Sequence, residues 1–182
     1  TRHQSHEAYR NDVPFLLKVL SIGKALSIQA HPNKSLAEIL HKRDPVNYKD
    51  SNHKPELIVA LTPFEGLCCF RKLSAVIAYA TSIAPLGRLL ADVLRTPATS
   101  APASADDEKA VLQGIMTKLY KTDAATIRDA LREHQANLSA LTPPLSNEDR
   151  VFLRTMKEFP DDVGCWMVYI LNLVLLSPGE AL

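Results

Sequence analysis

Polar and apolar side chains alternate along residues 25–31, ALSIQAH. Because successive side chains of a β-strand point to opposite faces, a strand here places Ser27, Gln29 and His31 on one face. The intervening apolar side chains then lie on the other face. The stretch therefore predicts a β-strand with a polar row backed by an apolar one. An ordinary half-exposed strand with its polar face in water has the same alternation.

A second predicted strand, residues 56–61, contains a carboxylate that we expect to be buried. Glu56 shares its face with two apolar side chains, and the opposite face is wholly apolar. A buried carboxylate is costly unless it is paired or bound to a metal. A His and a carboxylate supported by an amide oxygen suit zinc or another first-row divalent ion, although Gln is an unusual zinc ligand. Spacing alone does not decide between a metal site of Gln29, His31 and Glu56 and an ordinary strand whose polar face lies in water.

Two lysines near these strands are further candidates. Lys54 shares the face of Glu56 if the strand extends back through Pro55, and an exposed ion pair between the two is the alternative interpretation. Lys18 belongs to a predicted strand at residues 13–20, where a phosphate would satisfy its ammonium. A lysine at a sheet edge with its ammonium in water fits the same pattern.

Helical periodicity replaces the strand pattern after Arg71. A short helix is also expected earlier, at residues 35–42, where Ser35 and Glu38 have capping-box spacing. A low-complexity stretch at residues 96–105 predicts a flexible connection. The other predicted helices cover residues 76–80, 86–94, 111–119, 127–141 and 151–159.

The β-rich composition returns from Cys165, and residues 171–176 are expected to form a strand before a turn. The order of patterns predicts an α+β fold in which helices interrupt a β domain. The expected division is 1–72 for the first part of the β domain, 73–159 for the helical insertion and 160–182 for the return.

Composition narrows the class of protein. The 182 residues carry a formal net charge of +1, which gives no basic field for nucleic acid or anionic lipid. The three cysteines have no C-x-x-C spacing, so they predict neither a disulfide framework nor a cysteine zinc site, and they favour a reducing compartment. The apolar run at residues 163–176 is shorter than the roughly 20 residues that span a bilayer, and we expect it in the core. The absence of a starting Met and the turn signal near Leu182 lead us to expect that both ends lie inside a longer protein.

Five strings of the sequence together resemble the type I mannose-6-phosphate isomerases. They are PFLLKVLS at 14–21, LSIQAHPN at 26–33, NHKPEL at 52–57, ALTPFEGLC at 60–68 and LNLVLLSPGEA at 171–181. The resemblance implies a cupin-like (jelly-roll) β-barrel interrupted by an all-α domain. It further implies one zinc ion held by Gln29, His31 and Glu56, with a fourth ligand, a His, beyond Leu182.

The same resemblance implies the reaction and the remaining site residues. Members of the family interconvert mannose 6-phosphate and fructose 6-phosphate through an enediol, so a small sugar phosphate is the expected partner, without nucleic acid or membrane. Lys54 is implied as catalytic, and Ser27 and Lys18 as phosphate-binding residues. We expect a cytoplasmic protein that is monomeric at full length. We expect the segment alone to be inactive, because it lacks the fourth ligand, an Arg used in catalysis and the remaining barrel strands of the family. Two alternatives stay open: a non-catalytic metal- or sugar-binding cupin, and a helical insertion that serves as a protein-interaction module.

Overall fold

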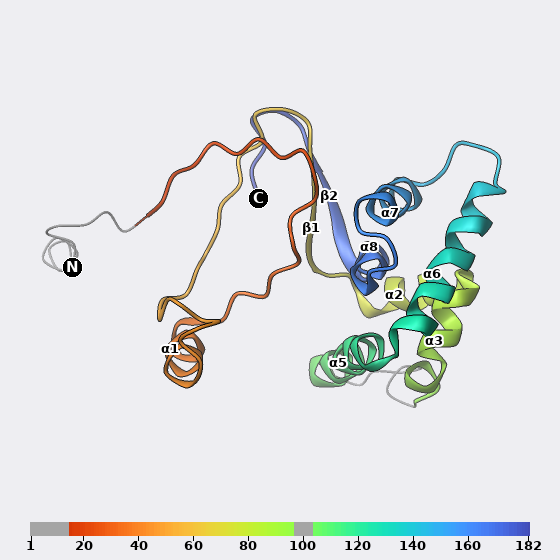
Figure 1. Ribbon diagram of the computed structural model, residues 1–182, viewed down its shortest axis with the longest axis horizontal. Coiled ribbons are helices and arrows are strands. Elements are labelled where there is room, and N and C mark those ends of the chain that lie inside the picture. Colours follow the sequence, from red (N-terminus) through yellow and green to blue (C-terminus); the bar gives the residue numbers. More distant parts are fainter. Residues whose placement is uncertain (1–14, 97–103) are drawn as a thin grey trace, which may run out of the picture.

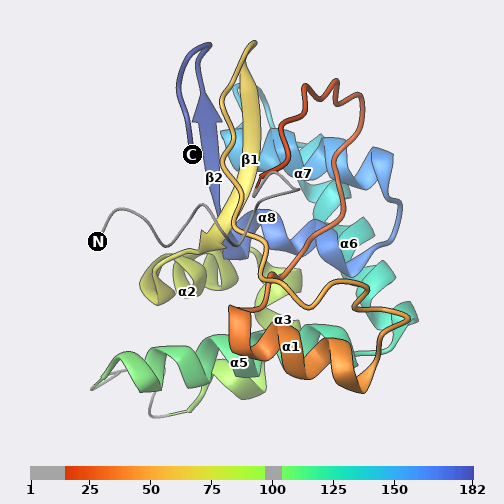
Figure 2. The same cartoon turned by 90° about the vertical axis from the view of Figure 1, so that its left-hand side faces the viewer.

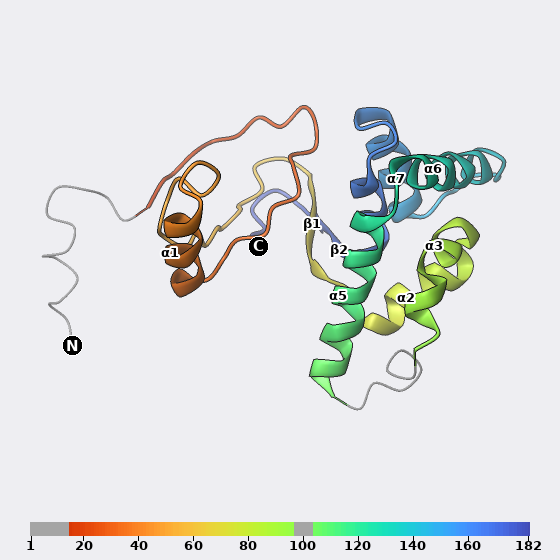
Figure 3. The same cartoon turned by 60° about the horizontal axis from the view of Figure 1, so that its bottom comes forward.

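The computed structural model describes residues 15–96 and 104–182, and its centre is a two-stranded antiparallel sheet. Strand β1 (Phe64–Phe70) pairs with β2 (Leu171–Leu176), from Phe64 opposite Leu176 to Phe70 opposite Leu171. Figures 1 and 3 show this sheet between a long irregular segment that carries helix α1 (Lys34–Arg43) and the packed helices of the rest of the chain. The mixed helical and strand composition agrees with the predicted α+β class.

Helices fill the chain between β1 and β2, as the periodicity predicted. Three of them begin at a side chain, Ser104, Asp123 or Ser146, that accepts a hydrogen bond from the backbone N–H three residues on. No helix in residues 15–96 or 104–182 is long and apolar enough to cross a membrane. The elements are α2 (Leu73–Ser82), α3 (Ala84–Leu94), α5 (Ala105–Lys121), α6 (Ala124–Ser139), α7 (Asn147–Glu158), the 3-10 helix η1 (Val163–Trp166) and α8 (Met167–Ile170), seen from a second side in Figure 2.

The core of the helical part is built around η1 and α8. Every residue from Cys165 to Ile170 is buried, so the prediction that the apolar run at 163–176 belongs to the core is confirmed for this part, whereas Leu175 is 48% exposed. The strand predicted at residues 171–176 is confirmed as β2, and the residues just before it form η1 and α8 although their composition is β-rich. The Asp162 side chain accepts a hydrogen bond from the Gly164 N–H and thereby starts a helical turn before the strand.

A buried hydrogen-bond chain links three elements through the core. His134 on α6 lies 2.8 Å from the Tyr169 hydroxyl on α8, which donates to the Asp149 carboxylate on α7, also over 2.8 Å. Burial lowers the pKa of His134 and raises the pKa of Tyr169, so both are neutral near pH 7. His134 also stacks on Trp166 with ring centroids 5.6 Å apart. Both rings thus pack in the core of the helical part.

The predicted strands of the N-terminal segment are largely absent. The described part of residues 13–31 forms no strand, and residues 13 and 14 lie outside the described ranges. Backbone N–H and C=O groups become a strand only when a neighbour pairs them, and no described segment does so here. Leu17 is accordingly 85% exposed.

The predicted strand at residues 56–61 is reduced to a short pairing with the end of the chain. Ile58 and Leu182 exchange backbone hydrogen bonds of 3.0 and 2.9 Å, and the Ala60 N–H donates to the carbonyl of Glu180 over 2.9 Å. The expectation that both faces of this segment are buried was wrong, because Leu57 is 76% exposed while Ala60 is 3% exposed.

Helix α1 (Lys34–Arg43) begins slightly earlier than predicted. Its N-cap is Asn33, whose side chain accepts from the Leu36 N–H over 2.9 Å. The expected capping box at Ser35 was wrong because Ser35 lies inside the first turn and its hydroxyl donates to Asn33. Of the predicted flexible connection at 96–105, residues 97–103 lie outside the described ranges, and Ala105 already belongs to α5.

The Tyr169 hydroxyl should stabilise the fold through its hydrogen bonds with buried His134 and half-buried Asp149. The substitution Tyr169→Phe removes the hydroxyl and leaves His134 Nε2 and Asp149 Oδ1 without this hydrogen-bond partner. We therefore expect a loss of about 1–3 kcal/mol in the free energy of unfolding. Denaturant titration followed by circular dichroism measures this change. Tyr120→Phe, at a side chain that is 56% exposed, is the control and should stay within about 0.5 kcal/mol of the parent. Equal effects of the two substitutions would contradict the role given to the chain of hydrogen bonds.

Candidate functional site

The clearest feature of the candidate site is the approach of His31 to Glu56. Their Nε2 and Oε1 atoms lie 3.2 Å apart, with the side chains 31% and 53% exposed. The chain leaves this point through α1 and returns, so the two residues meet although they are far apart in sequence. Glu56 was expected to be buried, and that expectation was wrong because its segment pairs on one side only. A polar contact between side chains this exposed contributes little to stability by itself.

Gln29 and Ser27 lie side by side, as their spacing of two predicted. The Gln29 Nε2 donates to the Ser27 hydroxyl across a long 3.5 Å contact, which turns the amide oxygen away from that hydroxyl. The structure thus brings together two pairs of the predicted site residues, one within residues 27–29 and one between His31 and Glu56. The side-by-side placement does not require the predicted strand, which is absent.

The donor set can be tested against the demands of zinc. Tetrahedral zinc holds N and O ligands at about 2.0–2.2 Å, which places neighbouring donor atoms roughly 3.3–3.6 Å apart. The 3.2 Å between His31 Nε2 and Glu56 Oε1 is within a few tenths of an ångström of that spacing. No group of three or more His, Cys, Asp or Glu residues is placed to hold a metal in residues 15–96 and 104–182. A third ligand from the described residues must be of another type, such as the Gln29 amide oxygen, and the three side chains then supply nitrogen and oxygen donors of the kind that zinc accepts.

Lys18 and Lys54 are exposed in the described structure. Within the described residues neither ammonium belongs to an ion pair. Glu56 pairs with His31 and not with Lys54, so the alternative of a Lys54–Glu56 edge ion pair is wrong here. Both lysines can therefore reach an anionic ligand without breaking an existing ion pair.

The segment that carries the candidate ligands is anchored to the end of α7. The Ala25 N–H donates to the Glu158 carboxylate over 3.1 Å, and the Lys24 ammonium lies 4.1 Å from the ring centroid of Phe159. Further along, a Cβ on Gly164 would lie only 3.3 Å from Ile28 Cδ1, so this glycine permits the close approach of the segment. Sequence reasoning missed these anchors because no local spacing relates residues 24–28 to a helix end so far away.

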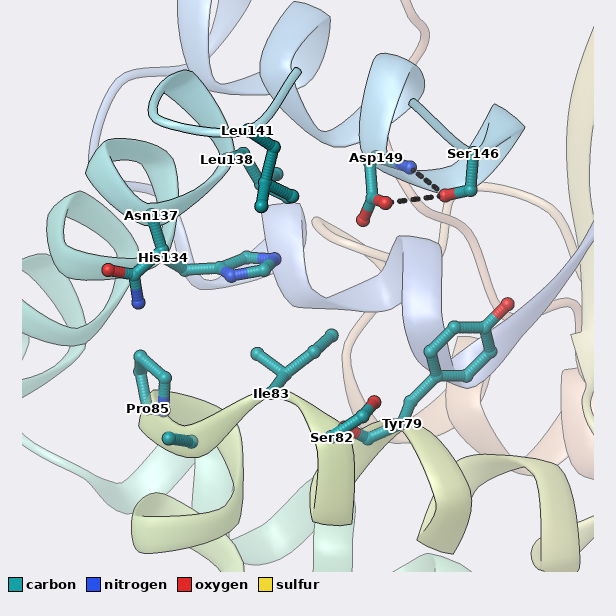
Figure 4. A pocket seen from close by; sticks show the side chains of 11 residues that line it. Tyr79, Ser82, Ile83, Pro85, His134, Asn137, Leu138, Leu141, Ser146 and Asp149 are labelled. Atoms are coloured by element: carbon teal, nitrogen blue, oxygen red, sulfur yellow. Dashed lines mark hydrogen bonds between the residues drawn. The ribbon is translucent and has the colours of Figure 1, made fainter. Parts of the chain in front are cut away.

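One cavity of the helical part lies away from these residues. It measures about 420 Å³ and opens among the ends of α2, α6 and α7, with Tyr79, His134 and Asp149 among its lining residues (Figure 4). None of the predicted site residues lines it. The Asp149 carboxylate already accepts hydrogen bonds from Ser146 and Tyr169. The cavity is a gap between helix ends whose polar groups serve the fold.

These features define a class of protein: a mixed α and β chain in which an inserted helical part anchors a segment carrying a candidate divalent-metal site. Two domain families match the sequence, the catalytic domain of type I phosphomannose isomerase over residues 1–73 and its helical insertion domain over residues 89–171. The chain belongs to the type I phosphomannose isomerase family.

Curated proteins similar to this chain are mannose-6-phosphate isomerases. The chain is 40% identical to the mannose-6-phosphate isomerase of Emericella nidulans over 199 residues, covering 97% of this chain and 43% of that protein. It is 37% identical to the human mannose-6-phosphate isomerase over 183 residues, with the same two coverages. The chain therefore spans about two fifths of the length of these curated relatives.

Solved structures of such enzymes share the fold. A zinc-bound mannose 6-phosphate isomerase is 30% identical, with a TM-score of 0.72 over 89% of this chain and 41% of that one. The Salmonella typhimurium enzyme bound to fructose 6-phosphate and zinc is also 30% identical, with a TM-score of 0.71 and the same coverages. The likeness extends over both the irregular N-terminal segment and the helices.

Removing an anchor on α7 should loosen the segment that carries the candidate ligands. A cation–π contact of about 0.5–1 kcal/mol corresponds to a two- to fivefold change in local opening, so Phe159→Ala should speed tryptic cleavage after Lys24 by that factor. Mass spectrometry of timed digests measures the rate. Cleavage after Lys18, upstream of the anchor, is the internal control and should not change. Glu133→Ala, which removes a surface ion pair on α6, should leave both rates unchanged. Equal acceleration after Lys18 and Lys24 would show general unfolding instead of a lost anchor.

Proposed function

We propose that this chain is part of a zinc-dependent aldose–ketose isomerase that interconverts mannose 6-phosphate and fructose 6-phosphate. The observation that carries the proposal is the 3.2 Å approach of His31 Nε2 to Glu56 Oε1, in a chain whose relatives are mannose-6-phosphate isomerases. A zinc-bound relative of known structure supports the choice of metal.

We assign three zinc ligands to this chain: the amide oxygen of Gln29, the Nε2 atom of His31 and the carboxylate of Glu56. When bound, the ion acts as a Lewis acid that polarises the sugar carbonyl and stabilises the negative charge that develops on its oxygen. The anchoring of residues 24–28 to α7 supports this assignment, because a ligand set must be held in place before the ion arrives. A histidine beyond Leu182 remains the predicted fourth ligand, and the segment alone is inactive in this account.

The reaction moves a proton between C1 and C2 of the sugar, through an enediol in which both carbons carry oxygen. We assign Lys54 to this step, with its ammonium donating a hydrogen bond to the sugar oxygen that gains negative charge. Its position two residues before Glu56 supports the assignment, since the same backbone segment then carries a metal ligand and the donor.

The phosphate of the sugar gives Ser27 and Lys18 their proposed roles. The Ser27 hydroxyl donates to a phosphate oxygen, and the Lys18 ammonium supplies the opposing charge. Both residues are exposed, and Ser27 lies beside Gln29, which would place the phosphate on the same side of the segment as the ligands. The fructose 6-phosphate bound to the Salmonella typhimurium enzyme supports a sugar phosphate as the partner.

Several features of the whole protein remain part of the proposal. The β1–β2 pair and the short pairing of residues 58–60 with 179–182 form a fragment of a cupin-like barrel, with residues 1–72 and 160–182 belonging to it and 73–159 inserted. A cytoplasmic location, a role in supplying mannose for GDP-mannose, and a monomeric full-length protein are predictions from the family resemblance.

The main alternative is a non-catalytic cupin that binds metal or sugar. It requires the same ligands but not Lys54, so activity separates the two. The third interpretation is a helical interaction module, which would need an exposed apolar patch. In the described residues between β1 and β2, the exposed large apolar side chains are Tyr120 on α5 and Leu141 just after α6, so the surface gives this interpretation little support.

Loss of any one proposed ligand should remove zinc. In the purified full-length protein we expect about one zinc per chain, falling well below half in Gln29→Ala, His31→Ala and Glu56→Ala. Elemental analysis measures the content, and circular dichroism checks that the variants fold. His41→Ala and Glu38→Ala, which remove the same residue types from α1, are the matched controls and should keep their zinc. Unchanged zinc in all three ligand variants would overturn the assignment.

Lys54 should matter for turnover and not for the metal. Removing one hydrogen-bond donor to an oxygen that gains negative charge costs about 10²–10³ in rate, so Lys54→Met should lower kcat by that factor while zinc content stays constant. A coupled assay of fructose 6-phosphate formation measures kcat. The control is Lys49→Met, at another exposed lysine of the same segment. Zinc binding by the parent protein with no interconversion at all would favour the non-catalytic alternative.

A further inference from the structure

Two adjacent thiols on β1 lie unusually close together. The Sγ atoms of Cys68 and Cys69 are 3.6 Å apart, and both cysteines are free. Cys68 is half-buried and Cys69 is exposed, so reagents in solution reach the pair. Neither residue has a role in the function proposed above.

The proximity of the thiols results from a distortion of the strand. Successive side chains of a regular strand point to opposite faces, which would separate the two sulfurs. Here Cys69 has a φ of 52°, in the left-handed region, and the pairing with β2 shifts register between Cys68 and Phe70. This β-bulge turns both thiols to the same side of the chain.

A single side chain on the neighbouring strand fixes the bulge. The Asn172 Nδ2 lies 3.1, 3.4 and 3.0 Å from the carbonyl oxygens of Cys68, Cys69 and Phe70. Three consecutive carbonyls directed at one amide group do not occur in a regular strand, where they alternate in direction. The Asn172 amide therefore holds the backbone in the conformation that pairs the sulfurs.

The spacing of the sulfurs matches that of two ligands on one atom. At a metal–sulfur distance of about 2.3 Å and tetrahedral angles, two sulfurs lie roughly 3.8 Å apart. Soft thiolates select soft partners. In the described residues no third His, Cys, Asp or Glu completes a metal cluster, so the site supplies two ligands only. The ligand that fits this site best is an atom that takes three substituents in all, carries one of them already and binds the two thiols as the others.

We propose that Cys68 and Cys69 form a vicinal dithiol site that chelates trivalent arsenicals carrying one organic group. In the reaction with such a compound, R–As(OH)₂, two As–O bonds break and two As–S bonds form. The two thiol protons leave with the hydroxyl groups as two water molecules, and the oxidation state of arsenic does not change. The bulge pre-arranges the second thiol, so the ring closes without rearrangement of the strand.

The test uses phenylarsine oxide on the purified protein. After treatment, intact-mass and peptide spectra should show one phenylarsenic group joining Cys68 and Cys69. This adduct should survive excess 2-mercaptoethanol and be released by dithiothreitol, because only a dithiol competes with a chelating pair. In Cys69→Gly, whose glycine accepts the positive φ, release by the monothiol should be about 100-fold faster, as expected when the second attachment is lost.

Two further variants separate chelation from simple thiol reactivity. Cys165→Ser removes the buried third cysteine and should leave the adduct unchanged. Asn172→Ala keeps both thiols but releases the bulge, and it should accelerate monothiol release relative to the parent. Equal release rates for the parent and Cys69→Gly, or an adduct that maps to Cys165, would overturn the proposal. An adduct retained equally in Asn172→Ala would show that the bulge is not what pairs the thiols.

Discussion

The antiparallel pairing of β1 with β2 is the constraint on which the rest of the structure depends. It joins the residues that enter the helical part to those that leave it, with Phe70 opposite Leu171. The helices therefore form a closed excursion between two neighbouring strands. The same register carries the chain beyond β2 to a turn at Gly179, whose N–H donates to the Ala60 carbonyl over 2.7 Å. The pairing of residues 58–60 that follows holds the segment of Glu56.

The candidate site uses two anchors that act from opposite directions. Residues 24–28 are held by the end of α7, through Glu158 and Phe159, and the segment after Glu56 is held by the end of the chain. Neither anchor belongs to the site, yet together they bring His31 to 3.2 Å from Glu56. The helical part thus positions one half of the proposed ligand set, which gives a physical reason for an insertion next to a metal site. Its own polar centre, from His134 through Tyr169 to Asp149, serves stability.

The sequence predicts what depends on local periodicity and much less of what depends on distant partners. Helices α2, α3, α5, α6 and α7 and the strand at 171–176 were predicted because their apolar spacing is local, whereas η1 and α8 were not. The strands expected at 13–20 and 25–31 were wrong, because a strand exists only where another segment satisfies its backbone, and the described residues provide none there. For the site, alternation placed Ser27 beside Gln29 correctly, whereas the burial expected for Glu56 failed. The close thiols of Cys68 and Cys69 depend on Asn172 in the far strand, which no spacing reveals.

X-ray absorption at the zinc edge of the full-length protein identifies the atoms that hold the metal. Zinc held by Gln29, His31 and Glu56 has only nitrogen and oxygen neighbours, at about 2.0–2.2 Å, with the outer-shell scattering of an imidazole ring. We expect this spectrum, with no change in Cys68→Ser. A sulfur neighbour at about 2.3 Å would contradict it, since the metal would then sit on the cysteine pair and not between His31 and Glu56.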